Sequence, residues 1–187
     1  EEIKVKRMSD FENLSLRGTA NCYIVSPEAG HYEFDATVIG NGKAGILDNT
    51  FHTQNPNISP ASAEVLWEFQ YNKQHRYSDL YPMMETKSII SFIEYYKESG
   101  KVHIVTTGEK GNALIAVKDA NGNILWSWHI WCTEAPEEQT YIVTLPKGEG
   151  TDYQIKYIAL DRNIGATRAD RGTEEHDWLE AVGFAYQ

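Results

Sequence analysis

The sequence predicts an all-β protein: an antiparallel β-sandwich with long loops and at most one or two short helices. Three observations lead to this fold class. Runs of alternating apolar and polar residues recur along the chain and give about nine to ten strands at intervals of roughly 8–15 residues. Turn-forming residues, chiefly glycine, asparagine, aspartate and proline, separate those runs. No amphipathic stretch extends beyond about three helical turns.

The strongest local signal lies in residues 112–131, NALIAVKDANGNILWSWHIW, which predict a two-stranded antiparallel hairpin. Asn121 and Gly122 suit the positive φ of a tight type I′ turn. With that two-residue loop, six apolar side chains share one face as cross-strand pairs: Val117 with Trp126, Ile115 with Trp128, and Ala113 with Ile130. The opposite face is mixed, and its pairs are Ala116 with Ser127, Leu114 with His129, and Asn112 with Trp131.

The apolar face of this hairpin needs a cover, most simply a second sheet. We therefore expect Trp126 and Trp128 in the core of a sandwich. A slip of one residue in the pairing would bury Lys118 and His129 and expose both tryptophans, so the register is expected to be firmly set.

Two further hairpins are expected, one over residues 21–39 and one that joins 88–96 to 101–106. In the first, alternate residues share the buried face: Tyr32, Phe34, Ala36 and Val38. The turn-rich segment at 27–30 supplies its loop.

Single strands are expected at four other places: 3–7, 64–71, 140–146 and 153–160. Strand 64–71 alternates, which places three apolar residues on one face: Val65, Trp67 and Phe69. Residues 10–16 predict either a strand or a helical turn. We expect one sandwich-like domain over residues 1–187, with 1–18 as an N-terminal extension or edge strand. Residues 161–187 are expected to form an irregular C-terminal segment or the start of a further module.

The charge balance argues against nucleic acid as a partner. The 187 residues include 17 Lys and Arg against 27 Asp and Glu, so the net charge is −10. Phosphate contacts require clustered basic residues, and the one basic run is short and lies at 4–7. No run of about 18 apolar residues is present, so no membrane-spanning helix is expected. The opening Glu1-Glu2-Ile3 is polar and lacks Met, which indicates a mature or trimmed chain.

The two cysteines allow two interpretations. Cys22 and Cys132 each lie in a strand-like run. If the two strands are neighbours, a disulfide can form in an oxidising compartment. The alternative is two buried free thiols. The spacing is unlike that of a zinc site, so no metal is expected there.

The nucleotide and metal motifs in the chain are weak. Residues 40–45 match GxGxxG, but no helix is expected to follow, so a surface loop is the better interpretation. Residues 119–123, DANGN, resemble part of a calcium loop, but the glycine is misplaced and the closing glutamate is missing. We therefore expect no cofactor, no metal and no catalytic residues.

Several side chains are candidates for ligand binding. His129 and Trp131 could form a sugar-stacking or proton-transfer site, against the alternative of a half-buried histidine bonded to the backbone. Trp178 follows the titratable run 174–177, which is either a site or an exposed helix start. Adjacent Asp161 and Arg162 are expected to be structural, as an ion pair or backbone anchor. Exposed aromatic candidates are Trp131, Tyr95 and Tyr96.

Three segments carry a family resemblance: ANCYIVSPEAGHYEFDATVIGNG (20–42), KGNALIAVKDANGNILWSWHIWCTE (110–134) and LDRNIGA (160–166). Together with the closing VGFAYQ (182–187), they resemble a module of secreted, surface-attached proteins of Bacteroidetes, the fimbrillin-like adhesins and fimbrial tip proteins. The resemblance implies an all-β module exported to the outer-membrane surface or the extracellular space, usually as a lipoprotein. It also implies a role in adhesion or pilus assembly, without catalytic residues.

The sequence therefore supports two functions. The first is a non-catalytic surface adhesion or fimbrial module, with other fimbrial subunits, a host receptor or a glycan as partner and a membrane link only through an anchor outside this chain. The alternative, motivated by the 11 Tyr and 5 Trp, is a carbohydrate-binding accessory domain of a secreted glycan-processing protein.

Overall fold

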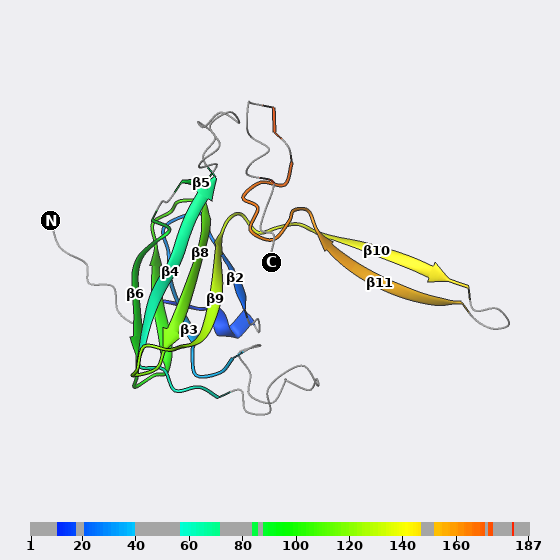
Figure 1. The fold of residues 1–187 in the computed structure, drawn as a ribbon. Helices are drawn as coiled ribbons and strands as arrows, with labels where there is room; N and C mark the ends of the chain where they lie inside the picture. The colour runs from blue at the N-terminus through cyan, green and yellow to red at the C-terminus, as the bar shows by residue number, and fades with distance from the viewer. Residues whose placement is uncertain are drawn as a thin grey trace.

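The computed structural model describes residues 11–17, 21–39, 57–71, 84–85, 88–146, 152–170, 172–173 and 181. Most of the described residues lie in β-strands, which form two packed sheets and one separate hairpin (Figure 1), so the all-β prediction is confirmed. The predicted strand at 3–7 and the GxGxxG segment at 40–45 lie outside the described residues.

The first sheet has four strands in the order β1-β3-β7-β6. Their bounds are Glu12–Asn13 (β1), His31–Asp35 (β3), Lys101–Thr106 (β7) and Ile90–Tyr96 (β6). Strands β6 and β7 pair antiparallel, so the hairpin predicted for 88–106 is confirmed. A short 3-10 helix, Leu14–Arg17, follows β1, so the segment predicted as a strand or a helical turn contains both.

The second sheet has five strands in the order β2-β9-β8-β4-β5. Their bounds are Cys22–Val25 (β2), Ile124–Cys132 (β9), Gly111–Lys118 (β8), Ser62–Tyr71 (β4) and Met84–Glu85 (β5). Strand β2 runs parallel to β9. The hairpin predicted for 21–39 is therefore wrong, because β2 and β3 belong to different sheets and the turn between them crosses the sandwich.

The register of the central hairpin is confirmed, but its loop is longer than predicted. Strands β8 and β9 pair Ile115 with Trp128 and Val117 with Trp126. The Gly122 N–H donates to the Asp119 carbonyl, and the Asp119 N–H donates to the Asn123 carbonyl. These bonds enclose a three-residue loop with Gly122 at φ 83°, in place of a two-residue type I′ turn. A bulge next to Trp126 restores the predicted pairing.

A second bulge overturns one predicted face. The register of β4 against β8 shifts between Val65 and Trp67, so Val65 lies opposite Ile115 while Trp67 lies opposite Leu114. The bulge turns Trp67 and Phe69 to the face of the sheet opposite the core. On that face their rings stack, with 5.4 Å between centroids. Regular alternation in the sequence could not show this inserted residue.

The core lies between the two sheets. Phe34 of β3 packs its ring 5.1 Å from that of Tyr23 in β2 and 5.0 Å from that of Trp128 in β9. The predicted buried face of β3 is confirmed, since Tyr32, Phe34, Ala36 and Val38 are all buried. Trp128 is 1% exposed, and Trp126 packs at the margin of the same cluster.

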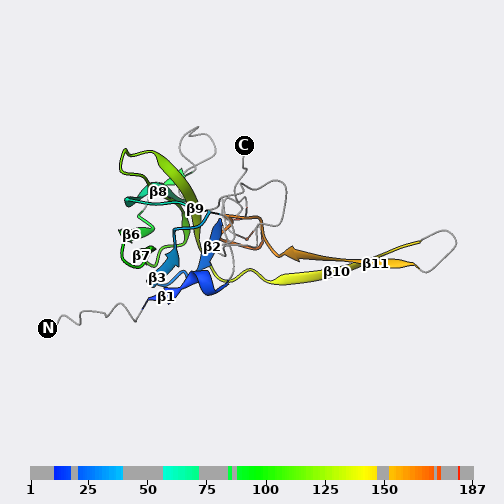
Figure 2. The ribbon, with the colours of Figure 1, turned by 90° about the horizontal axis from the view of Figure 1, so that it is seen from below.

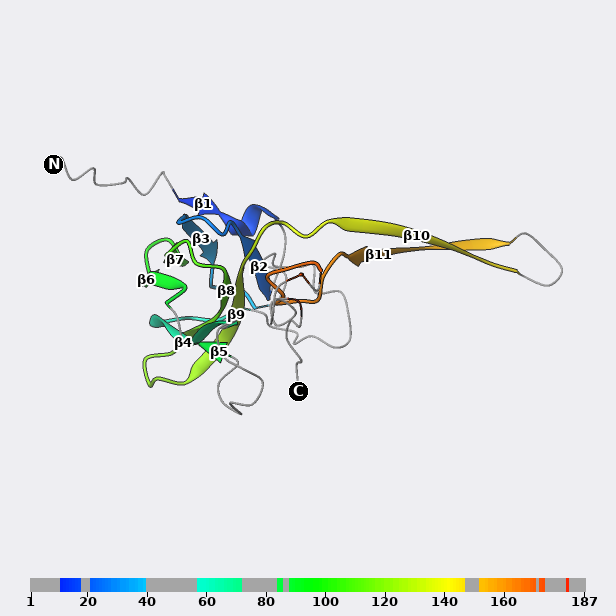
Figure 3. The ribbon, with the colours of Figure 1, turned by 90° about the horizontal axis from the view of Figure 1, so that it is seen from above.

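Strands β10 (Glu138–Leu145) and β11 (Tyr153–Leu160) form an antiparallel hairpin, here called the arm. Among the described strands, each pairs only with the other. Figure 2 and Figure 3, each at a right angle to Figure 1 and seen from below and from above, show that the arm extends away from both sheets. The strands predicted at 140–146 and 153–160 are thus confirmed as strands, but they add no layer to the sandwich.

Replacing Trp128 with alanine is expected to cost on the order of 3–5 kcal/mol, because it empties a large buried volume between the sheets. Typical domains have a total stability of about 5–15 kcal/mol, so the loss is a large share. Urea unfolding measures it. Trp67→Ala, at a site 39% exposed outside the core, is the matched control and should cost much less. Equal losses in the two variants would contradict the assigned faces.

Candidate functional site

Residues 161–167 return across the outer face of the five-stranded sheet and anchor the base of the arm. The Asp161 N–H donates to the Glu137 carbonyl at 2.9 Å. The Arg162 guanidinium donates to both carboxylate oxygens of Asp161 at 2.9 and 3.0 Å and reaches the Thr133 hydroxyl at 3.3 Å. These bonds hold the pKa of the Asp161 carboxyl below its ordinary value. The ion pair, one of the two arrangements expected for Asp161 and Arg162, is present.

The same segment covers Trp131. The Ala166 N–H donates to the Asn163 carbonyl across a turn with Gly165 at φ 84°, a conformation that favours glycine. The Gly165 carbonyl accepts from Asn112 Nδ2 at 2.9 Å, and the Ala166 carbonyl accepts from Trp131 Nε1 at 3.0 Å. Trp131 is 1% exposed, so its prediction as an exposed ligand-binding aromatic is wrong. The cover comes from a segment distant in sequence, which local pattern could not reveal.

Three side chains beneath this cover form a connected polar chain. Cys22 Sγ lies 3.3 Å from His129 Nδ1, and His129 Nε2 lies 2.9 Å from Asn112 Oδ1. A thiol, an imidazole and an amide in this order also make up cysteine nucleophile sites, where the imidazole takes the thiol proton. The sequence analysis placed His129 opposite Leu114 but did not connect it to Cys22.

Burial disfavours a thiolate–imidazolium ion pair between Cys22 and His129. Burial raises the pKa of the Cys22 thiol to about 11 and lowers the pKa of the His129 imidazole to about 4. At neutral pH the thiol therefore keeps its proton and the imidazole is neutral. The three side chains therefore form a buried polar network that links β2 to β9 and β8. His129 is more deeply buried than the predicted half-buried histidine, and side chains supply the two contacts described above.

The possible disulfide between Cys22 and Cys132 is contradicted. The predicted adjacency of their strands is confirmed, since β2 pairs with β9. However, Cys22 lies opposite His129 while Cys132 lies opposite Val25, three positions further along. Cys132 joins the core cluster and Cys22 points to the other face of the sheet with His129, so their sulfur atoms cannot meet. Both cysteines are free thiols.

Thiol labelling checks both conclusions. In the native protein near neutral pH, Cys22 and Cys132 should react with iodoacetamide far more slowly than a free thiol, because burial raises the pKa of Cys22 to about 11 and that of Cys132 to about 12. After unfolding without reductant, both should titrate. Rapid labelling of native Cys22 would instead indicate an activated thiolate, and absent thiols in the unfolded chain would indicate a disulfide.

The lowered pKa of His129 gives the stability a pH dependence. Its pKa is about 4 when folded against 6.5 as the ordinary value, so the unfolded chain binds the proton more readily between these values. The free energy of unfolding should fall as pH drops from 6.5 to 4, by about 3 kcal/mol from this group. His129→Gln should lessen that fall in urea titrations. Burial also lowers the pKa of His103, but this residue is present in both proteins and affects both titrations alike. Identical slopes in the two proteins would contradict the assignment.

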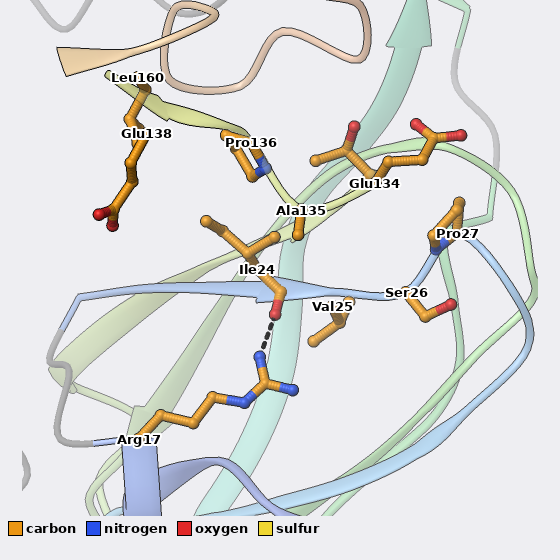
Figure 4. Close-up of a pocket in the computed structure, with 11 residues that line it drawn as sticks. Arg17, Ile24, Val25, Ser26, Pro27, Glu134, Ala135, Pro136, Glu138 and Leu160 are labelled. Carbon is orange, nitrogen blue, oxygen red and sulfur yellow. Dashed lines mark hydrogen bonds between the residues drawn. The ribbon is translucent and has the colours of Figure 1, made fainter. Parts of the chain in front are cut away.

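An open pocket of about 590 Å³ lies where the arm meets the body (Figure 4). Its wall includes Ile24 of the edge strand β2 and Leu160 of the arm, together with the carboxylate of Glu138. Arg17 projects into it and donates to the Ile24 carbonyl. The edge of β2 that faces away from β9 thus borders a partly apolar hollow at the root of the arm.

The arm itself carries the largest concentration of exposed apolar side chains among the described residues. Seven of the twelve large hydrophobic residues that are exposed lie on its two strands: Tyr141, Ile142, Val143, Tyr153, Tyr157, Ile158 and Leu160. Exposed apolar surface of this kind marks an interaction site in a folded protein. The sequence predicts the two strands but carries no motif that marks a site there.

The other candidates are either partly buried or outside the described residues. Tyr95 packs on the core, and Tyr96 packs against His103 with ring centroids 4.4 Å apart. Trp178 and the run 174–177 lie outside the described residues. Within the part of the chain that the structure describes, no group of three or more histidine, cysteine or acidic side chains could hold a metal ion. No helix in that part is long and apolar enough to cross a bilayer.

Comparison of the chain with protein-family models, with curated proteins and with solved structures found no match.

Proposed function

We propose that this chain is a non-catalytic module of the bacterial cell surface that serves adhesion or fimbrial assembly, with the arm as its contact element. The observation that carries the proposal is the arm, which holds seven exposed large hydrophobic residues away from the body. Exposed apolar surface of this kind marks a site that binds another macromolecule.

The base of the arm supports this function. The Asp161 N–H donates to the Glu137 carbonyl, and Arg162 links this point to Thr133 at the end of β9. Loads applied to the arm therefore pass into the buried part of the five-stranded sheet. Asp161, Arg162 and Thr133 lie in segments that carry the family resemblance, as do Asn112, Trp131 and Ala166, which make the neighbouring contacts.

Excision of the arm tests the proposal. Because Glu137 and Asp161 are hydrogen-bonded at its root, residues 138–160 can be replaced by Gly-Gly without disturbing either sheet. We expect beads coated with the intact chain to attach to host-cell or bacterial surfaces and beads coated with the excised variant to lose attachment. The thermal unfolding of both chains should be similar. Undiminished attachment after excision would contradict the proposal.

A carbohydrate-binding accessory domain is the second candidate, and one observation favours it. Tyr141, Tyr153 and Tyr157 lie on one face of the arm, each about half exposed. Aromatic faces in a row can stack on sugar rings. A glycan array probed with the intact chain separates the two functions: saturable binding to one sugar, lost in Tyr157→Ala, would favour carbohydrate binding.

A further inference from the structure

The arm has two chemically different faces. Residues paired directly across an antiparallel ribbon share a face, and the pairs in the arm include Tyr141 with Tyr157 and Val143 with Ile155. The face with these pairs, here called the apolar face, comprises Tyr141, Val143, Leu145, Tyr153, Ile155 and Tyr157. The pair Gln139 and Ala159 lies at its root, where Gln139 Oε1 accepts from the Tyr141 hydroxyl at 2.6 Å. The opposite face alternates with polar groups and contains Thr140, Ile142, Thr144, Gln154, Lys156 and Ile158.

The apolar face is exposed and carries no charge. Tyr141 and Tyr157 are each 52% exposed, and Val143, two residues along the strand from Tyr141 on the same face, is 41% exposed. Aromatic side chains present about 150–250 Å² each, so the whole face offers roughly 500 Å² of accessible surface. That is near the largest patch found on typical monomers, and such patches are commonly functional.

An isolated two-stranded ribbon is at best marginally stable in water. Among the described strands, β10 and β11 have no neighbour in a sheet except each other. A third or fourth strand, or a layer packed on the apolar face, would supply the burial that the ribbon lacks. The arm therefore has the properties of a surface that a binding partner covers.

We infer that the apolar face of the arm binds the same face of a second copy of this chain; this inference rests on the proposed function and names its partner. Two such faces are complementary because both are apolar and uncharged, and a two-fold axis between the 141/157 and 143/155 pairs places tyrosines against aliphatic side chains. The pair buries about 1,000 Å², the lower limit for a specific interface.

Charge favours a second copy over a lipid surface. Binding to a bilayer surface draws on basic side chains beside the apolar face, and the arm's Lys156 lies on the opposite face. Each chain carries a net charge of −10, so two bodies in contact would repel each other. Antiparallel arms keep the bodies at opposite ends of the complex, because each arm extends away from its own sheets.

Sedimentation equilibrium of the full chain across the micromolar range tests the inference. The intact chain should dimerise, and Tyr141→Lys should raise the dimer Kd by on the order of 100-fold, as loss of a central interface aromatic does. Ile142→Lys is the matched control, since Ile142 is the next residue, is 62% exposed and lies on the opposite face. It should leave the dimer Kd within a fewfold range. Neither residue belongs to the core, and thermal unfolding of the body confirms the fold of both variants.

A monomeric intact chain, or equal weakening by both variants, would overturn the inference. A dimer that is insensitive to Tyr141→Lys would also overturn it and would indicate pairing through the open strand edges. If the intact chain is monomeric but its bead attachment still requires the arm, the proposed function stands and only the identity of the partner fails. If attachment does not require the arm but the dimer is sensitive to Tyr141→Lys, the dimer stands and the proposed function fails.

Discussion

Burial of β9 on both of its faces is the constraint on which the rest of the structure depends. Its last five residues, 128–132, are all buried. Trp128 faces the core beside Phe34, whereas Trp131 faces the opposite side of the sheet. An antiparallel sheet ordinarily leaves one face to solvent, so a strand of this kind needs an additional cover. Residues 165–167 supply it, and the chain must return across the sheet to do so. The path between β9 and this cover is the arm, whose root is fixed by the contacts of Asp161 with Glu137 and of Arg162 with Thr133.

Short-range pattern was enough to predict much of the fold. The alternation in residues 112–131 gave the correct partners for Trp126 and Trp128, because a one-residue slip would have exposed them. It failed where an extra residue enters a strand, as between Val65 and Trp67, since a bulge leaves no compositional mark there. It also failed for β2, which looked like the first half of a local hairpin. Its true partner, β9, is remote in sequence, and pairing of that kind depends on the whole topology.

The candidate site was less predictable than the fold, for a physical reason. Exposure of Trp131 could not be judged without knowing that Ala166 would lie over its indole nitrogen. The Cys22–His129–Asn112 chain likewise joins three separate strands. The arm did leave a signal in the sequence: residues 140–146 and 153–160 are apolar at both odd and even positions, with Ile142 and Ile158 on one face and Tyr141 and Tyr157 on the other. The apolar residues that share the face of Tyr141 and Tyr157 are the part of this pattern that indicates an interaction surface.

The parallel pairing of β2 with β9 has a consequence for the order in which the chain folds. The contact between Cys22 and His129 spans 107 residues, while the hairpins β6–β7 and β8–β9 close over short loops. Closing the long loop costs more entropy, so β2 is expected to join the sheet after those hairpins have formed. At usual rates of synthesis, roughly 5–20 s pass between the emergence of β2 and that of its partner. During that interval Tyr23 and Val25 have no sheet to enter. The nascent chain then presents a short apolar strand that chaperones can bind and that other nascent chains can pair with.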